Sequence, residues 1–148
     1  MSKIEKVLLT GQTHTMLHKG ASRAGHGNVD LELSSPGNAR LNQSFVDIVP
    51  HPTAEQFFAG AWSACYISAV VLAAQEKKVA LPADLAVDIE VDLGQTGEDY
   101  FLQARFNVSL PGLAQDVAEA IAHRGHEICP YSKATRGNID VALNVSVS

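Results

Sequence analysis

The sequence predicts a single α+β domain, with an antiparallel sheet packed against two main helices, spanning residues 1–148. Its length fits one domain that buries its own hydrophobic core. Four segments alternate between apolar and polar residues, as half-buried strands do, and two others have helical patterns. We find no repeat, linker or low-complexity stretch, so the strands and helices are expected to share one core.

The four alternating segments are expected to pair as antiparallel strands, with one face on the core and one toward water. They are residues 29–33, 85–93, 100–110 and 139–147. Residues 94–99 include two glycines and are expected to form the hairpin loop between the second and third strands. Residues 4–10 add a further strand, whereas the short apolar stretch 45–49 has no assignment.

The first helix is predicted to begin at an N-cap, Thr53. Gln56 stands three residues later, as in a capping box. The helix is apolar on nearly all sides up to Ala74, which predicts a central helix buried all round. Its apolar run, residues 57–74, is shorter than the ~20 residues of a membrane span and includes a glycine and two serines, so a core helix is expected.

The second helix is predicted to run from after Gly112 to about Cys129. One of its faces consists of small residues, namely Ala118, Ala122, Gly125 and Cys129. Small residues also flank Cys65 on the first helix. They let two helices approach closely, and a disulfide requires Cα atoms within ~7 Å. The two cysteines are therefore either a nucleophile with its resolving thiol or two buried small hydrophobes.

Charge and composition exclude several classes of function. The net charge of −5 and the lack of a basic stripe argue against nucleic-acid binding. The N-terminal residues lack the apolar region of a signal peptide, and two cysteines without an export signal indicate a reducing compartment. We therefore expect a cytoplasmic protein without a membrane partner. His126-x-x-Cys129 alone is a weak zinc pattern, so no metal is expected.

Two blocks of sequence resemble the OsmC/Ohr family, in particular its organic hydroperoxide resistance branch. They are EQFFAGAWSAC at residues 55–65 and HEICPYSKATRGNID at residues 126–140. The resemblance covers almost the whole chain and is weakest between residues 13 and 52. It implies an intertwined homodimer and a metal-free cysteine peroxidase that reduces organic, fatty-acid-type hydroperoxides. Cys65 would be the peroxidatic cysteine and Cys129 the resolving one. The resemblance implies no bound cofactor: an external dithiol, a dihydrolipoyl group on a lipoylated protein, would reset the pair.

Activation of Cys65 needs a cation, because a thiol with a pKa near ~8.5 is mostly protonated at neutral pH. Cys65 lies too far into its helix for the N-terminal dipole to act. The resemblance implies an arginine from the early loop, held by Glu55. Here His18 stands at the arginine position. Glu55 lies ~15 Å along the helix from Cys65, so it is expected to reach the site across a dimer interface or to act through a long intermediary such as arginine. Other candidate cations are Lys19, Arg23 and Arg40.

Four aromatic residues near Cys65 are either a wall for an apolar substrate or plain core, namely Phe57, Phe58, Trp62 and Tyr66. The segment 37–50 is longer and more apolar than the resemblance leads one to expect. Loss of the arginine favours an alternative function, a non-catalytic thiol redox sensor or a hydrophobic-ligand-binding protein of the same fold.

Overall fold

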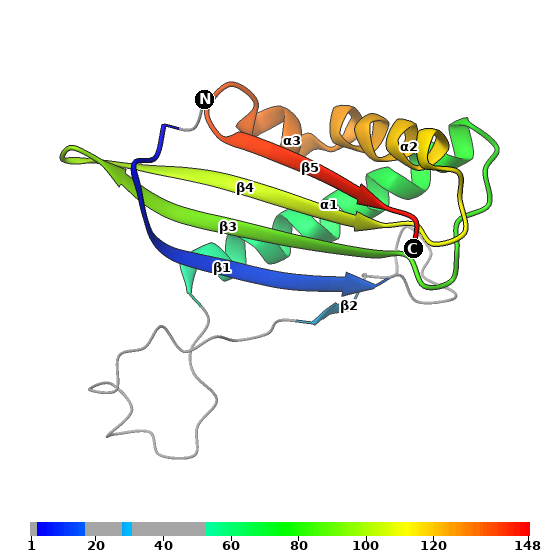
Figure 1. The fold of residues 1–148 in the computed structure, drawn as a ribbon, viewed down its shortest axis with the longest axis horizontal. Coiled ribbons are helices and arrows are strands. Elements are labelled where there is room, and N and C mark those ends of the chain that lie inside the picture. Colours follow the sequence, from blue (N-terminus) through cyan, green and yellow to red (C-terminus); the bar gives the residue numbers. More distant parts are fainter. Residues whose placement is uncertain (1–2, 17–27, 31–52) are drawn as a thin grey trace, which may run out of the picture.

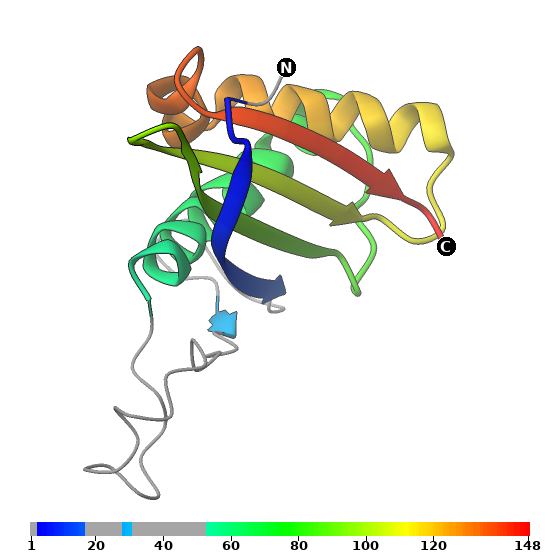
Figure 2. The ribbon, with the colours of Figure 1, turned by 60° about the vertical axis from the view of Figure 1, so that its left-hand side comes forward.

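The computed structural model describes residues 3–16, 28–30 and 53–148. Five strands form one sheet in the order β2-β1-β3-β4-β5, and α1 and α2 lie on the same face of it (Figures 1 and 2). The strands are β1 (Lys6–Met16), β2 (Asn28–Asp30), β3 (Ala86–Thr96), β4 (Asp99–Ser109) and β5 (Asp140–Ser146). The helices are α1 (Ala54–Glu76), α2 (Gln115–Ile128) and α3 (Pro130–Thr135). The predicted α+β class with two main helices is confirmed.

The sheet is mixed, not fully antiparallel as the sequence pattern suggested. β1, β3 and β4 pair antiparallel, but β5 runs parallel to β4, with Gln103 opposite Asp140. The chain between them crosses back over the sheet as α2 and α3, and such a crossover returns a strand in the same direction. Period-two alternation reports which face of a strand is buried, but not the direction of its neighbour.

The β3–β4 hairpin is longer and tighter than predicted. Its ladder runs to the pair Thr96–Asp99, across most of the expected loop, and Gly97 takes a positive φ of 59° in the turn. The N-terminal segment extends this end of the sheet: Ile4 fills the space above Gly94, and Glu5 donates to the Gln95 carbonyl. Residues 29 and 30 of the predicted strand 29–33 belong to β2, whereas segments 31–33 and 45–49 lie outside the described residues.

The N-terminus of α1 is capped as the sequence predicts. The Gln56 N–H donates to Thr53 Oγ1 at 3.1 Å, and the Thr53 N–H donates to Gln56 Oε1 at 2.9 Å. One side of α1 contacts β1 and β3, and another contacts α2. By length and composition α1 could cross a membrane, but 56% of its most apolar stretch is buried in the fold, as in the core helix of a soluble protein.

The expectation that α1 is buried on every side is wrong for the described chain. Phe57 is 60% exposed, and Ala61 and Ser68 are also exposed on the same side of the helix. A helix with two packed sides keeps a third side free, and the described residues place nothing over it. Part of the apolar surface of α1 is therefore not covered by the described residues.

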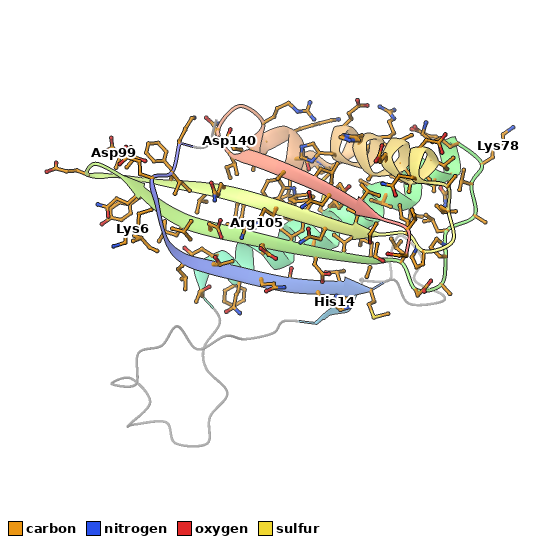
Figure 3. All side chains as sticks on the ribbon, in the orientation of Figure 1. Lys6, His14, Lys78, Asp99, Arg105 and Asp140 are labelled. Carbon is orange, nitrogen blue, oxygen red and sulfur yellow. The ribbon has the colours of Figure 1, made fainter. Side chains whose placement is uncertain are left out.

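The sheet face opposite the helices carries a network of charged side chains (Figure 3). Arg105 on β4 binds Asp92 through two nitrogens, with Nη2–Oδ1 at 3.0 Å, and its Nε donates to Glu90 at 2.8 Å. Thr10 and Gln103 also donate to Asp92, whose side chain is only 1% exposed. These pairs connect β1, β3 and β4 on the face that lies away from the cysteines.

Candidate active site

The structure brings the two cysteines into direct contact. Cys65 lies about three turns into α1, and Cys129 ends α2 and precedes α3. Their sulfurs are 3.4 Å apart, with the Cys129 thiol donating to Cys65, and both are reduced. A disulfide needs ~2.05 Å, so a small movement would join them. Cys129 is fully buried, whereas Cys65 is partly exposed.

The predicted small-residue face of α2 explains this contact. Ala118, Ala122 and Gly125 are buried against the rest of the fold. A Cβ on Gly125 would lie 3.0 Å from Val70 Cγ2 and 3.3 Å from Val70 Cα, so α1 and α2 meet here almost backbone to backbone. The Cys129 N–H donates to the Gly125 carbonyl at 2.9 Å, which fixes Cys129 relative to this close approach.

The immediate surroundings of Cys65 disfavour its thiolate. Burial, together with the Cys129 thiol, raises the pKa of Cys65 to about 11. The backbone N–H of Tyr131, in the first turn of α3, hydrogen-bonds to the sulfur and lowers the pKa. No cation among the described residues contributes to this pKa. The activating charge predicted from the sequence must come from elsewhere if the thiolate is to form at neutral pH.

The aromatic residues around Cys65 divide into core and surface. Trp62 and Tyr66 have no exposed area and pack edge-to-face on Phe106, each with ring centroids 4.9 Å apart. Phe58 is partly buried against Trp62, and Phe57 is exposed. The burial of Trp62 and Tyr66 favours the core interpretation for these two. A substrate wall of Phe57 and Phe58 stays a prediction.

The remaining predicted site residues are not brought to Cys65 in the described structure. Glu55 lies in the first turn of α1, where its backbone packs against Gly11 of β1. The other predicted contributors lie outside the described residues, namely His18, Lys19, Arg23, Arg40 and segment 37–50. Their part in the site stays a prediction.

Ser132 of α3 was not identified from the sequence as a contributor to the site. The Trp62 indole N–H donates to Ser132 Oγ at 3.0 Å, and the Tyr66 hydroxyl donates to the Ala122 carbonyl at 2.8 Å. The signal for α3 was Pro130 directly after Cys129, because proline favours the first position of a helix.

His126, one turn before Cys129, packs edge-to-face on Phe106 with ring centroids 5.6 Å apart. Its buried Nδ1 has no hydrogen-bond partner in the described part of the chain, and burial lowers its pKa. These features favour the neutral imidazole. Across the described ranges, no three His, Cys, Asp or Glu side chains are placed to hold a metal ion.

Comparison with known proteins identifies the family of this chain. The family model described as OsmC-like protein matches residues 47–144. An organic hydroperoxide resistance protein of Xanthomonas axonopodis pv. citri (strain 306) is 32% identical over 99% of this chain and 100% of its own length. The crystal structure of OhrB, an organic hydroperoxide resistance protein of Bacillus subtilis, is 28% identical, with a TM-score of 0.65 over 94% of this chain and 98% of that one. A corresponding protein from Legionella pneumophila is 32% identical, with a TM-score of 0.62 over 94% and 97% of the two chains. The chain therefore belongs to the OsmC-like family, among relatives named for organic hydroperoxide resistance.

Proposed function

We propose that this protein is a cysteine peroxidase that reduces organic hydroperoxides to alcohols. The contact between the sulfurs of Cys65 and Cys129 supports this most directly. The Cys65 thiolate attacks the terminal peroxide oxygen, the O–O bond breaks, and the alkoxide takes a proton and leaves as the alcohol. Cys65 is now a sulfenic acid, and Cys129 displaces its hydroxyl as water to form the disulfide.

An external dithiol completes the cycle in this proposal, and a dihydrolipoyl group on a lipoylated protein is the reductant we expect. Because Cys65 is partly exposed and Cys129 is buried, the dithiol can reach only the Cys65 sulfur. Attack there releases the Cys129 thiol, and the second thiol of the reductant then displaces Cys65. No bound cofactor or metal is needed, since the dithiol supplies both electrons.

Activation of Cys65 is the step for which the described residues offer least support. With a pKa of about 11, roughly one thiol in ten thousand is ionised at pH 7. We propose that a cation from the segments outside the described ranges, His18 or Arg23, approaches the sulfur with Glu55 as its carboxylate partner. A nearby positive charge lowers the pKa of a thiol, whereas a neutral side chain does so poorly. The side chain that approaches Cys65 must therefore be protonated.

The free side of α1 supports the proposal that the protein is a homodimer, whereas its proposed cytoplasmic location rests on the sequence alone. On this side the described residues leave an apolar stripe exposed or only partly buried. It consists of Phe57, Ala61, Ala64, Val71 and Leu72. A second copy packed there would bury it and lie beside Cys65 on the same helix.

A second candidate function follows from the same raised pKa. If no cation reaches Cys65, its thiol reacts slowly, and the disulfide then acts as a redox signal and not as a turnover intermediate. A protein of this kind would oxidise once per molecule. A peroxidase consumes many equivalents of peroxide as long as dithiol is present.

The deciding experiment is the consumption of cumene hydroperoxide with dihydrolipoamide by the wild type, Cys65→Ser and Cys129→Ser. We expect many turnovers in the wild type and none with Cys65→Ser. With Cys129→Ser we expect loss of the intramolecular disulfide, and in a parallel reaction without dithiol we expect oxidation to stop at the Cys65 sulfenic acid. Consumption of only one equivalent by the wild type would reject the peroxidase in favour of the redox sensor.

A further inference from the structure

A buried hydrogen bond connects α1, which carries Cys65, to α3, which begins directly after Cys129. The Trp62 indole N–H donates to Ser132 Oγ at 3.0 Å, and both residues have no exposed area. An indole nitrogen can only donate, so away from water it needs this acceptor. Trp62 lies one helical turn before Cys65 in α1. Ser132 lies three residues after Cys129, and it is the buried residue of α3.

The first turn of α3 affects both sulfurs. Pro130 begins this helix directly after Cys129, so the direction of the turn determines where the Cys129 side chain lies. The next residue, Tyr131, directs its backbone N–H at the Cys65 sulfur. No side chain caps the N-terminus of α3, so this turn is held by its contacts with α1 and α2.

A second hydrogen bond fixes the other side of Cys129. The Tyr66 hydroxyl donates to the Ala122 carbonyl in α2 at 2.8 Å. Trp62 and Tyr66 flank Cys65 on α1, and their partners flank Cys129 on α2 and α3. The two aromatic side chains therefore tie α1 to the chain before and after the resolving cysteine.

We propose that the Trp62–Ser132 hydrogen bond is a positioning device for the thiol pair, an inference that rests on the peroxidase function proposed above. It holds the first turn of α3 so that Cys129 stays in contact with Cys65 and the Tyr131 N–H stays on the Cys65 sulfur. Trp62 and Ser132 are positioning residues, because they act through these groups. The step they assist is condensation, in which the S–S bond forms, the S–O bond of the sulfenic acid breaks and water leaves.

The test is the Ser132→Ala variant in dithiothreitol redox buffers, where the oxidised fraction is trapped by alkylation and read from the protein mass. We expect the equilibrium constant for the Cys65–Cys129 disulfide to fall by about 3- to 10-fold, as for loss of one buried hydrogen bond. In a Cys129→Ala background, alkylation of Cys65 should also need a higher pH. Trp62 is the only tryptophan in the sequence, so its fluorescence reports the altered contact independently.

Two controls separate positioning from simple destabilisation. Thr135→Val removes a hydroxyl that bonds only within α3, to the Tyr131 and Ser132 carbonyls, and should leave the disulfide equilibrium unchanged. Trp62→Phe combined with Ser132→Ala leaves no buried N–H unpaired, so the disulfide equilibrium should stay weak although that cost is removed. The smaller ring leaves a cavity, and urea unfolding of each reduced variant measures that loss of stability separately.

A wild-type equilibrium constant in Ser132→Ala, or an equal loss in Thr135→Val, would overturn the inference. The proposed function is judged separately. If the wild type forms its disulfide normally but does not consume cumene hydroperoxide, the peroxidase function is wrong. The disulfide equilibrium constant of Ser132→Ala relative to that of the wild type still decides the role of Ser132.

Discussion

Replacing Gly125 with alanine tests how closely the two cysteine helices must pack. The added Cβ would lie 3.0 Å from Val70 Cγ2 and 3.3 Å from the Val70 N and Cα, and backbone atoms cannot rotate away. Alanine gains about 1 kcal/mol over glycine within a helix. Overpacking a tight contact costs about 1–3 kcal/mol. The two effects give a net destabilisation of about 0–2 kcal/mol, so crowding cancels or outweighs the gain in propensity.

The assay is urea unfolding of the reduced protein, together with the disulfide equilibrium of Cys65 and Cys129. Because the Cys129 N–H bonds to the Gly125 carbonyl, displacement of α2 should carry Cys129 with it and weaken the disulfide. Ala120→Gly at an exposed site of α2 measures the propensity effect alone and should cost about 1 kcal/mol. A Gly125→Ala protein that is more stable by that full amount, with an unchanged disulfide, would refute the close packing.

Four further predictions concern the core, the sheet face and the thiol. Phe106→Ala should destabilise by about 3–5 kcal/mol in urea unfolding, because Phe106 is fully buried beneath Trp62, Tyr66 and His126; a loss below 1 kcal/mol would contradict this packing. Arg105→Ala should cost about 1.5–3 kcal/mol because it leaves the buried Asp92 carboxylate without its cation, and adding Asp92→Asn should recover part of the loss. Burial alone would raise the pKa of Asp92, but hydrogen bonds from Arg105, Thr10 and Gln103 outweigh it and lower the pKa. The ionised Asp92 therefore stabilises the fold above the unfolded pKa, and this contribution is lost as the pH falls through the folded pKa. Asp92→Asn should accordingly show a smaller pH dependence of unfolding in an acid titration. Burial is the largest cause of the raised pKa of Cys65, so Cys129→Ala should leave the midpoint of Cys65 alkylation by iodoacetamide at alkaline pH, and a midpoint at or below the ordinary value of a free thiol would refute burial as the cause.

The features that local sequence determines were the ones predicted correctly. Thr53 and Gln56 cap α1 through contacts three residues apart, so the pattern is complete within one helical turn. The small residues spaced along α2 predicted a close approach of two helices, and Gly125 does pack closely on Val70 of α1. The same pattern left the cysteines as either a thiol pair or two buried small hydrophobes, and the structure places their sulfurs 3.4 Å apart.

The features that could not be predicted from the sequence depend on contacts between residues that are distant in the chain. The parallel direction of β5 follows from the crossover formed by α2 and α3, and alternation along β5 itself would be the same in either direction. The free side of α1 has the same apolar composition as its buried side, so composition cannot tell which one the sheet covers. The role of Ser132 depends on Trp62, seventy residues earlier, which places it beyond any local pattern.

The geometry of the thiol pair separates the two halves of the proposed reaction. Cys129 is buried, in contact with Cys65 and held by the backbone of α2, so the condensing thiol is already in place before any peroxide arrives. The attacking thiol is not prepared in the same way, because burial favours its protonated form. The burial that brings the two thiols together thus makes attack harder, and a cation must offset it. In this fold, variation in the segments that could bring that cation would change peroxidase rate while leaving disulfide formation intact.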